Sequence, residues 1–94
     1  MSNPSKEKGD RFEREIVHLC EERFLRAHRN RMSRAMPGES WDLEIAGRRV
    51  ECKKRHAGFK KISQWMTGND GVILGVDYEK PLVVVRLEDW LKLL

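Results

Sequence analysis

Residues 41–54 have the sequence WDLEIAGRRVECKK, and this stretch predicts a short β-hairpin. Apolar side chains alternate with polar ones along both arms, which is typical of strands with one apolar face: Leu43, Ile45, Val50 and Cys52. The turn is either 46–47, which pairs residue 42 with residue 51, or 47–48, which pairs residue 42 with residue 53. In both registers Asp42, Glu51 and Lys53 lie within about one or two strand spacings, because directly paired Cβ atoms are about 5 Å apart.

The polar face of this hairpin predicts a chemical site. Glu51 and Lys53 are two residues apart, so they point to one side of the strand and Cys52 points to the other. Like charges placed across a hairpin cost stability. Two carboxylates and an amine gathered there indicate a metal ion and a reacting water.

The chain has 94 residues and is expected to form one domain over residues 8–94, after a flexible N-terminus at residues 1–7. It contains no apolar run of membrane-spanning length and no signal-peptide pattern, so a cytoplasmic protein is expected. Two cysteines, Cys20 and Cys52, are too few for a disulfide framework and are predicted to be buried free thiols.

Positive charge is concentrated on either side of the hairpin stretch. The formal net charge is +4 and the sequence pI is about 9.3. Residues 26–34 carry four arginines and no acid, residues 48–61 carry seven basic residues and one acid, and residues 70–94 carry five acids and three bases. This distribution favours a polyanionic partner such as nucleic acid over the alternative of a solvated basic surface.

A helix is predicted over residues 8–27. Apolar residues recur there at spacings of three to four and form one arc: Phe12, Ile16, Leu19, Cys20 and Phe24. Glu13 projects inside this arc and Glu15 outside it. Because a buried carboxylate without a partner is costly, Glu13 requires a metal ion, a metal-bound water or a basic side chain.

The remaining elements predict an α/β fold with the order α-β-β-β-α-β-β-α. A weak strand is expected at 28–32, a loop at 36–40, a helix at 58–67, strands at 72–76 and 82–85, and a short helix at 87–94. The two later strands are continuously apolar, which is typical of a sheet covered on both faces.

Asp42 followed by Glu51-x-Lys53, on a hairpin after a helix with an inward Glu13, resembles the PD-(D/E)XK nuclease superfamily. Within it, the chain is most similar to archaeal-type Holliday-junction resolvases and to small phage nucleases of that kind. The likeness extends over most of the chain, to the strand at 72–76, although few residues are identical in kind. The sequence departs from the family where Trp41 replaces the Pro before Asp42, and the family's loop Ser has two candidates, Ser33 and Ser40.

The resemblance implies a restriction-endonuclease-like core, with a mixed central β-sheet flanked by helices, and a site for Mg²⁺ or Mn²⁺. Oxygen ligands suit these ions, and the implied set is Asp42, Glu51, the backbone carbonyl of Cys52 and, directly or through water, Glu13. The metal would lower the pKa of a bound water and shield the phosphate, while Lys53 would orient that water or stabilise transition-state charge. Gln64 matches a glutamine that often follows the motif.

The expected activity is therefore metal-dependent hydrolysis of DNA phosphodiesters, selected by DNA structure. Phosphate contacts are expected from basic side chains near the motif: Arg29, Arg31, Arg34, Lys54, Arg55 and Lys60. Symmetric cutting of two strands needs two sites, which predicts a homodimer formed through the 72–85 strands or the end at 90–94. The alternatives are a basic DNA-binding module without activity and a nuclease acting on nicked or linear DNA or on RNA. A phage-encoded protein would act in the host cytoplasm.

Overall fold

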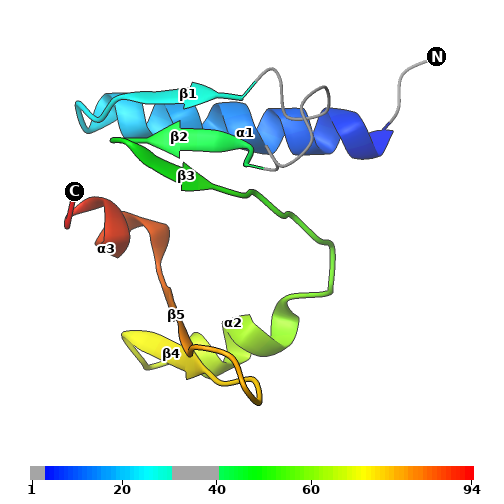
Figure 1. Ribbon diagram of the computed structural model, residues 1–94. Helices are drawn as coiled ribbons and strands as arrows, with labels where there is room; N and C mark the ends of the chain where they lie inside the picture. Colours follow the sequence, from blue (N-terminus) through cyan, green and yellow to red (C-terminus); the bar gives the residue numbers. More distant parts are fainter. Residues whose placement is uncertain (1–3, 31–40) are drawn as a thin grey trace. The chain divides into compact units, whose positions relative to one another are not determined.

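The computed structural model describes residues 4–30 and 41–94 (Figure 1). It confirms the α/β class and the predicted order of elements. The chain forms two compact units, residues 1–54 and residues 55–94. The described strands pair only in antiparallel fashion, in a three-stranded sheet in the first unit and a two-stranded sheet in the second. One domain over residues 8–94 stays a prediction.

Helix α1 (Pro4–Glu22) begins four residues before the predicted start and ends five residues before the predicted end. Residues 4–7, expected in a flexible N-terminus, form its first turn, where proline is tolerated because that backbone position needs no N–H. At the other end the backbone N–H groups of Arg23 and Leu25 donate to the Cys20 carbonyl. Phe24 has a φ of 58° and is 97% exposed, so its predicted place on the buried arc is wrong. Ile16 and Cys20 are buried as expected.

The first sheet has the order β1 (Ala27–Arg29), β2 (Leu43–Ile45) and β3 (Arg48–Val50). Leu43 pairs with Val50, which selects the register with the turn at 46–47. Ala46 and Gly47 have φ values of 48° and 84°, and two positive φ values in a two-residue loop are the requirement of a type I′ hairpin turn. The regular pairing ends at Leu43 and Val50, and the Asp42 backbone N–H donates to the Val50 carbonyl at 2.9 Å.

Helix α1 packs against β1 and β2. Leu43 is 0% exposed and Ile45 is 1% exposed, whereas Glu44 between them is only half-buried. Because strand side chains alternate, one face of the sheet packs into the core with Ile16 and Cys20. The polar ends of β2 and β3 are thus held at a fixed distance from α1.

The second unit contains α2 (Lys60–Met66), β4 (Gly71–Leu74), β5 (Leu82–Val85) and α3 (Leu87–Leu91). The guanidinium of Arg86 donates to the carbonyls of Met66, at 3.1 Å, and Asn69, at 3.0 Å. These bonds satisfy carbonyls at the C-terminal end of α2 and tie that end to the start of α3.

The β4–β5 hairpin differs from the expectation of strands buried on both faces. Ile73 pairs with Val83, and these side chains are 76% and 64% exposed. Val72 pairs with Val84, and both are half-buried. Since directly paired residues share a face, one face of the hairpin is half-buried and the other is an exposed apolar face.

Candidate functional site

Asp42 lies directly before β2 and joins the ends of two strands. Its backbone N–H donates to the Val50 carbonyl at 2.9 Å. Its carboxylate Oδ2 accepts a hydrogen bond from the Cys52 backbone N–H at 2.7 Å. A hydrogen bond to a charged acceptor is about twice as strong as a neutral one. Asp42 is therefore fixed at the end of the hairpin, beside the motif residues that follow β3.

Glu51 and Lys53 follow β3 directly. The Lys53 Nζ lies 3.1 Å from Glu51 Oε1, and both side chains are about half exposed, at 53% and 54%. This ion pair agrees with the prediction that the two side chains share one side of the chain. Cys52, between them, is half-buried.

Glu13 reaches the same region from α1 and is paired with a basic side chain. Arg29 Nε donates to Glu13 Oε1 at 3.1 Å, and a terminal nitrogen of Arg29 donates to Asp10 Oδ1 at 2.8 Å. The Glu13 side chain is 18% exposed, whereas Glu15 is exposed, so the predicted difference between the two is confirmed. Arg29 holds two carboxylates of α1, and its expected phosphate contact stays a prediction.

Asp10 was missed by the sequence reasoning, although a signal for it exists. It lies three residues before Glu13, and residues three apart share a face of a helix. The pairing with Arg29 depends on the strand that places this guanidinium against α1, and no local pattern reveals that contact.

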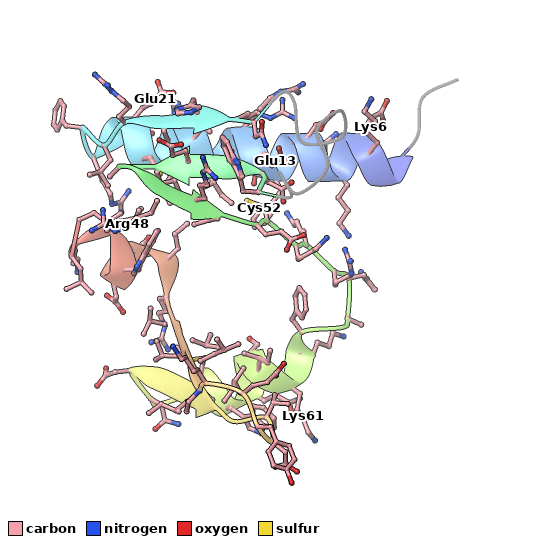
Figure 2. The ribbon with its side chains drawn as sticks, viewed as in Figure 1. Lys6, Glu13, Glu21, Arg48, Cys52 and Lys61 are labelled. Atoms are coloured by element: carbon pink, nitrogen blue, oxygen red, sulfur yellow. The ribbon has the colours of Figure 1, made fainter. Side chains whose placement is uncertain are left out.

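The negative charges of all three predicted carboxylates act on the thiol of Cys52. Figure 2 labels Glu13 on α1 and Cys52 in the segment after β3. Burial, followed by the negative charges of Asp42, Glu13 and Glu51, raises the pKa of this thiol to about 11. Three acids from α1, from the residue before β2 and from the residue after β3 therefore act on one point of the first unit. Each also has a protein partner, because Arg29 holds Glu13, Lys53 holds Glu51 and the Cys52 N–H binds Asp42.

The metal prediction receives no direct geometric support. Within residues 4–30 and 41–94, no group of three or more His, Cys, Asp or Glu side chains is positioned to hold a metal ion. The donor chemistry nevertheless suits Mg²⁺ or Mn²⁺, because the cluster offers carboxylates and backbone carbonyls.

The predicted basic and polar residues are distributed over both units. Lys54 ends the first unit, with its Nζ 5.3 Å from the centre of the Phe12 ring. Arg55, Lys60 and Gln64 belong to the second unit and are exposed. Gln64 therefore belongs to the second unit and the three carboxylates to the first. Arg31 and Arg34, and both candidate loop serines, Ser33 and Ser40, lie outside the described residues.

Trp41 is at the centre of a second group of interacting side chains, which was not predicted from the sequence. The rings of His28 and Trp41 meet edge to face, with centroids 6.1 Å apart and an interplanar angle of 83°. The guanidinium carbon of Arg49 lies 5.3 Å from the centre of a Trp41 ring. Glu44 pairs with both His28 and Arg49 in the sheet, so the three residues form one row across it.

Comparisons of the chain with protein families, with curated proteins and with solved structures gave no match. Among the residues that the structure describes, no helix combines the length and the apolar character needed to cross a membrane. The resemblance to the PD-(D/E)XK nucleases thus rests on the residues and their order along the chain.

Proposed function

We propose that this chain is a metal-dependent DNA endonuclease of the PD-(D/E)XK type, selective for DNA structure in the manner of Holliday-junction resolvases. The proposal includes a restriction-endonuclease-like core with a mixed central sheet. The described strands form antiparallel pairs in two small sheets. The observation that carries it is that the charges of Glu13, Asp42 and Glu51 all act on the Cys52 thiol, while Lys53 forms an ion pair with Glu51.

The residues have separable roles in this proposal. Mg²⁺ or Mn²⁺, when bound, would supply a nucleophilic water at neutral pH and offset the charge of the phosphate. Asp42, Glu51 and the Cys52 carbonyl would hold the ion, with Glu13 as a further ligand. Glu13 and Glu51 must then release Arg29 and Lys53. Lys53 becomes available to orient the water or to stabilise charge on the phosphate, and Arg29 becomes available for a phosphate contact.

Cleavage assays test this proposal with matched acidic controls. We expect Mg²⁺-dependent cleavage of a four-way DNA junction, and a loss of about 100-fold or more in Asp42→Asn, Glu51→Gln and Lys53→Ala. Asp77→Asn and Glu79→Gln make the same chemical changes in exposed residues of the second unit and should retain activity. Undiminished cleavage in Asp42→Asn and Lys53→Ala would contradict the site assignment.

A matched linear duplex, a nicked duplex and an RNA duplex of the same sequence should be assayed in parallel with the junction. Preference for the junction is expected. Equal cleavage of the linear duplex would contradict structure selectivity, and preference for RNA would contradict the assignment to DNA.

The second candidate function is a DNA-binding module without activity. It is favoured by the ion pairs that already neutralise Glu13 and Glu51. Calorimetric titration with Mn²⁺ separates the two candidates. The nuclease proposal predicts heat of binding that Glu51→Gln abolishes and Glu79→Gln does not change. The binding module predicts no heat in any variant, together with DNA affinity that falls steeply with salt.

The proposal also includes a homodimer, formed through the exposed apolar face of the β4–β5 hairpin. Ile73 and Val83 provide this face. Sedimentation should show a dimer that Ile73→Lys converts to a monomer, with Lys80→Ala as a control in the turn. A dimer that survives Ile73→Lys would assign the contact to another surface, such as residues 90–94.

A further inference from the structure

We infer that His28, Trp41 and Arg49 form a stacking site for an unpaired nucleobase, and that its tryptophan directly precedes Asp42 in the chain. This inference rests on the proposed function, and it specifies the feature of the nucleic acid that the site would select. Below, this group of three residues is called the stacking site.

The position of these residues on the sheet supports the inference. His28, Glu44 and Arg49 form one cross-strand row on the face opposite Leu43 and Ile45, because paired residues share a face and neighbours along a strand alternate. Trp41 lies outside β2, so it is not bound by that alternation, and its ring contacts His28 and Arg49. The buried core of the first unit is formed by other residues: Ile16, Cys20, Leu43 and Ile45.

The chemistry of the three groups supports a nucleobase as the ligand. Indole, imidazole and guanidinium are flat groups, and unpaired bases stack on aromatic rings and on arginine guanidinium planes. Arg49 is exposed and already lies over the Trp41 ring, so a base can extend or replace this contact. The Glu44 carboxylate in the same row can accept a hydrogen bond from an exocyclic amino group.

The position of Trp41 in the chain determines which nucleic-acid structures the stacking site would favour. Trp41 directly precedes Asp42, whose carboxylate is bonded to the Cys52 backbone N–H. A base held by Trp41 would have its backbone phosphates near the chain segment that carries Asp42. A base inside a duplex has neighbours on both faces and must be unstacked first, at a cost of a few kcal/mol. The stacking site would thus favour branch points, flaps and single strands over continuous duplex.

Tryptophan fluorescence can test the contact directly. The double variant Trp65→Phe, Trp90→Phe retains Trp41 as its only tryptophan. We expect its emission to be quenched when a short single-stranded oligonucleotide is added in EDTA, where no metal-dependent cleavage occurs. A duplex of matched sequence should quench it much less. Equal quenching by the two probes, or no quenching at saturation, would overturn the inference.

Affinity measurements by anisotropy of a labelled oligonucleotide provide the second test. Trp41→Leu should weaken single-strand binding by about five- to 150-fold, the range found when a stacking aromatic is removed. Trp41→Phe retains a ring and should restore most of the affinity. Duplex binding should change less than twofold in both variants. An equal loss on both probes would indicate a general folding defect and would overturn a role in selecting unpaired bases.

Arg48 and Arg49 offer a matched pair of controls. Arg48 follows the turn, and its guanidinium donates to the Ala46 carbonyl at 3.0 Å, so it lies outside the stacking site. Arg48→Ala and Arg49→Ala each remove one positive charge and should reduce the salt dependence of binding similarly. Only Arg49→Ala should lower the ratio of single-strand to duplex affinity. An equal ratio in both variants would contradict the inference.

The two proposals fail in distinguishable ways. Fluorescence and affinity are measured without a divalent metal, so the stacking site can hold even if no cleavage is ever observed. Conversely, metal-dependent cleavage with an unchanged preference in Trp41→Leu would leave the nuclease proposal standing and remove the stacking site.

Discussion

The two units differ in how their apolar and charged residues are used. In the first unit Cys20, Leu43 and Ile45 are at most 1% exposed, and side chains from different elements are joined by ion pairs and hydrogen bonds. In the second unit Met66 and Leu91 are buried, while several large apolar side chains, including Ile73, are exposed. A few fully buried residues, combined with polar links between elements, are therefore enough to fix the positions of three carboxylates.

The largest expected difference in stability is between the same Ile→Ala substitution made in each of the two units. Ile45 is 1% exposed and Ile73 is 76% exposed. Ile45→Ala should reduce the free energy of unfolding by about 2–5 kcal/mol, because it leaves a cavity in the core. At protein concentrations low enough to keep the chain monomeric, Ile73→Ala should change it by no more than about 0.5 kcal/mol. Urea unfolding followed by circular dichroism measures both values, and equal losses would mean that the two units do not differ in packing.

The next effect separates the structural and chemical roles of Asp42. Asp42→Ala removes the acceptor of the Cys52 N–H and should cost about 1.5–3 kcal/mol of stability, the range for a hydrogen bond to a charged group. Asp42→Asn keeps an acceptor oxygen and should cost less, while abolishing cleavage equally. Asp77→Ala, in the second unit, is the control with no expected effect. Equal stability of the Ala and Asn variants would show that the Cys52 N–H bond contributes nothing.

A smaller effect compares two arginines that link elements by different means. Arg29 binds two carboxylates, whereas Arg86 binds two backbone carbonyls. Each Arg→Ala variant should lose about 1 kcal/mol of stability. Because salt screens ion pairs, the loss in Arg29→Ala should shrink between low and high ionic strength, while that in Arg86→Ala should not. A double-mutant cycle of Arg29→Ala with Glu13→Gln measures their coupling, and a coupling energy of zero would contradict the pairing.

A further effect is a pH dependence in the first unit, which contains both cysteines. The pKa of Cys52 is raised from 9.0 to about 11, so the folded state keeps this proton while the unfolded state loses it. The stabilising contribution is complete below pH 9 and is lost between pH 9 and about 11. The difference in unfolding free energy between the native chain and Cys52→Ser should therefore fall over this window.

Alkylation resolved by peptide mapping provides an independent readout of the same thiol. Only the thiolate reacts, so Cys52 should be modified slowly at pH 8. Glu51→Gln and Asp42→Asn remove negative charges that raise its pKa and should speed the reaction. Unchanged rates in both variants would contradict the action of these carboxylate charges on the Cys52 thiol.

Much of the local structure could be predicted because it depends on neighbours in the chain. The alternation of apolar and polar residues predicted two possible hairpin registers, one of which the structure has. The apolar arc of α1 predicted that Glu13 is less exposed than Glu15, as observed. The helix end was wrong because its position depends on the backbone turn at Phe24, where a positive φ stops the helix and exposes an apolar ring.

The contacts that were missed join residues far apart in the sequence. The strand β1 directs Arg29 to Asp10 and Glu13, 19 and 16 residues away, and the basic character of its segment does not reveal this pairing. The row formed by His28, Glu44 and Arg49 likewise depends on the order of three strands. Charge counts along the chain record how many basic residues are available but not which of them are already paired.

The turn at Ala46 and Gly47 has a consequence for how this chain can change over evolution. Eight residues separate Asp42 from Glu51, and the tight turn pairs the first of these eight, Leu43, with the last, Val50. Substitutions inside the hairpin can be absorbed by local repacking. Insertion or deletion of one residue shifts the pairing and moves every following side chain to the other face of the sheet. This segment should therefore tolerate changes in composition far better than changes in length, which a library of single-residue insertions over residues 43–50 would reveal.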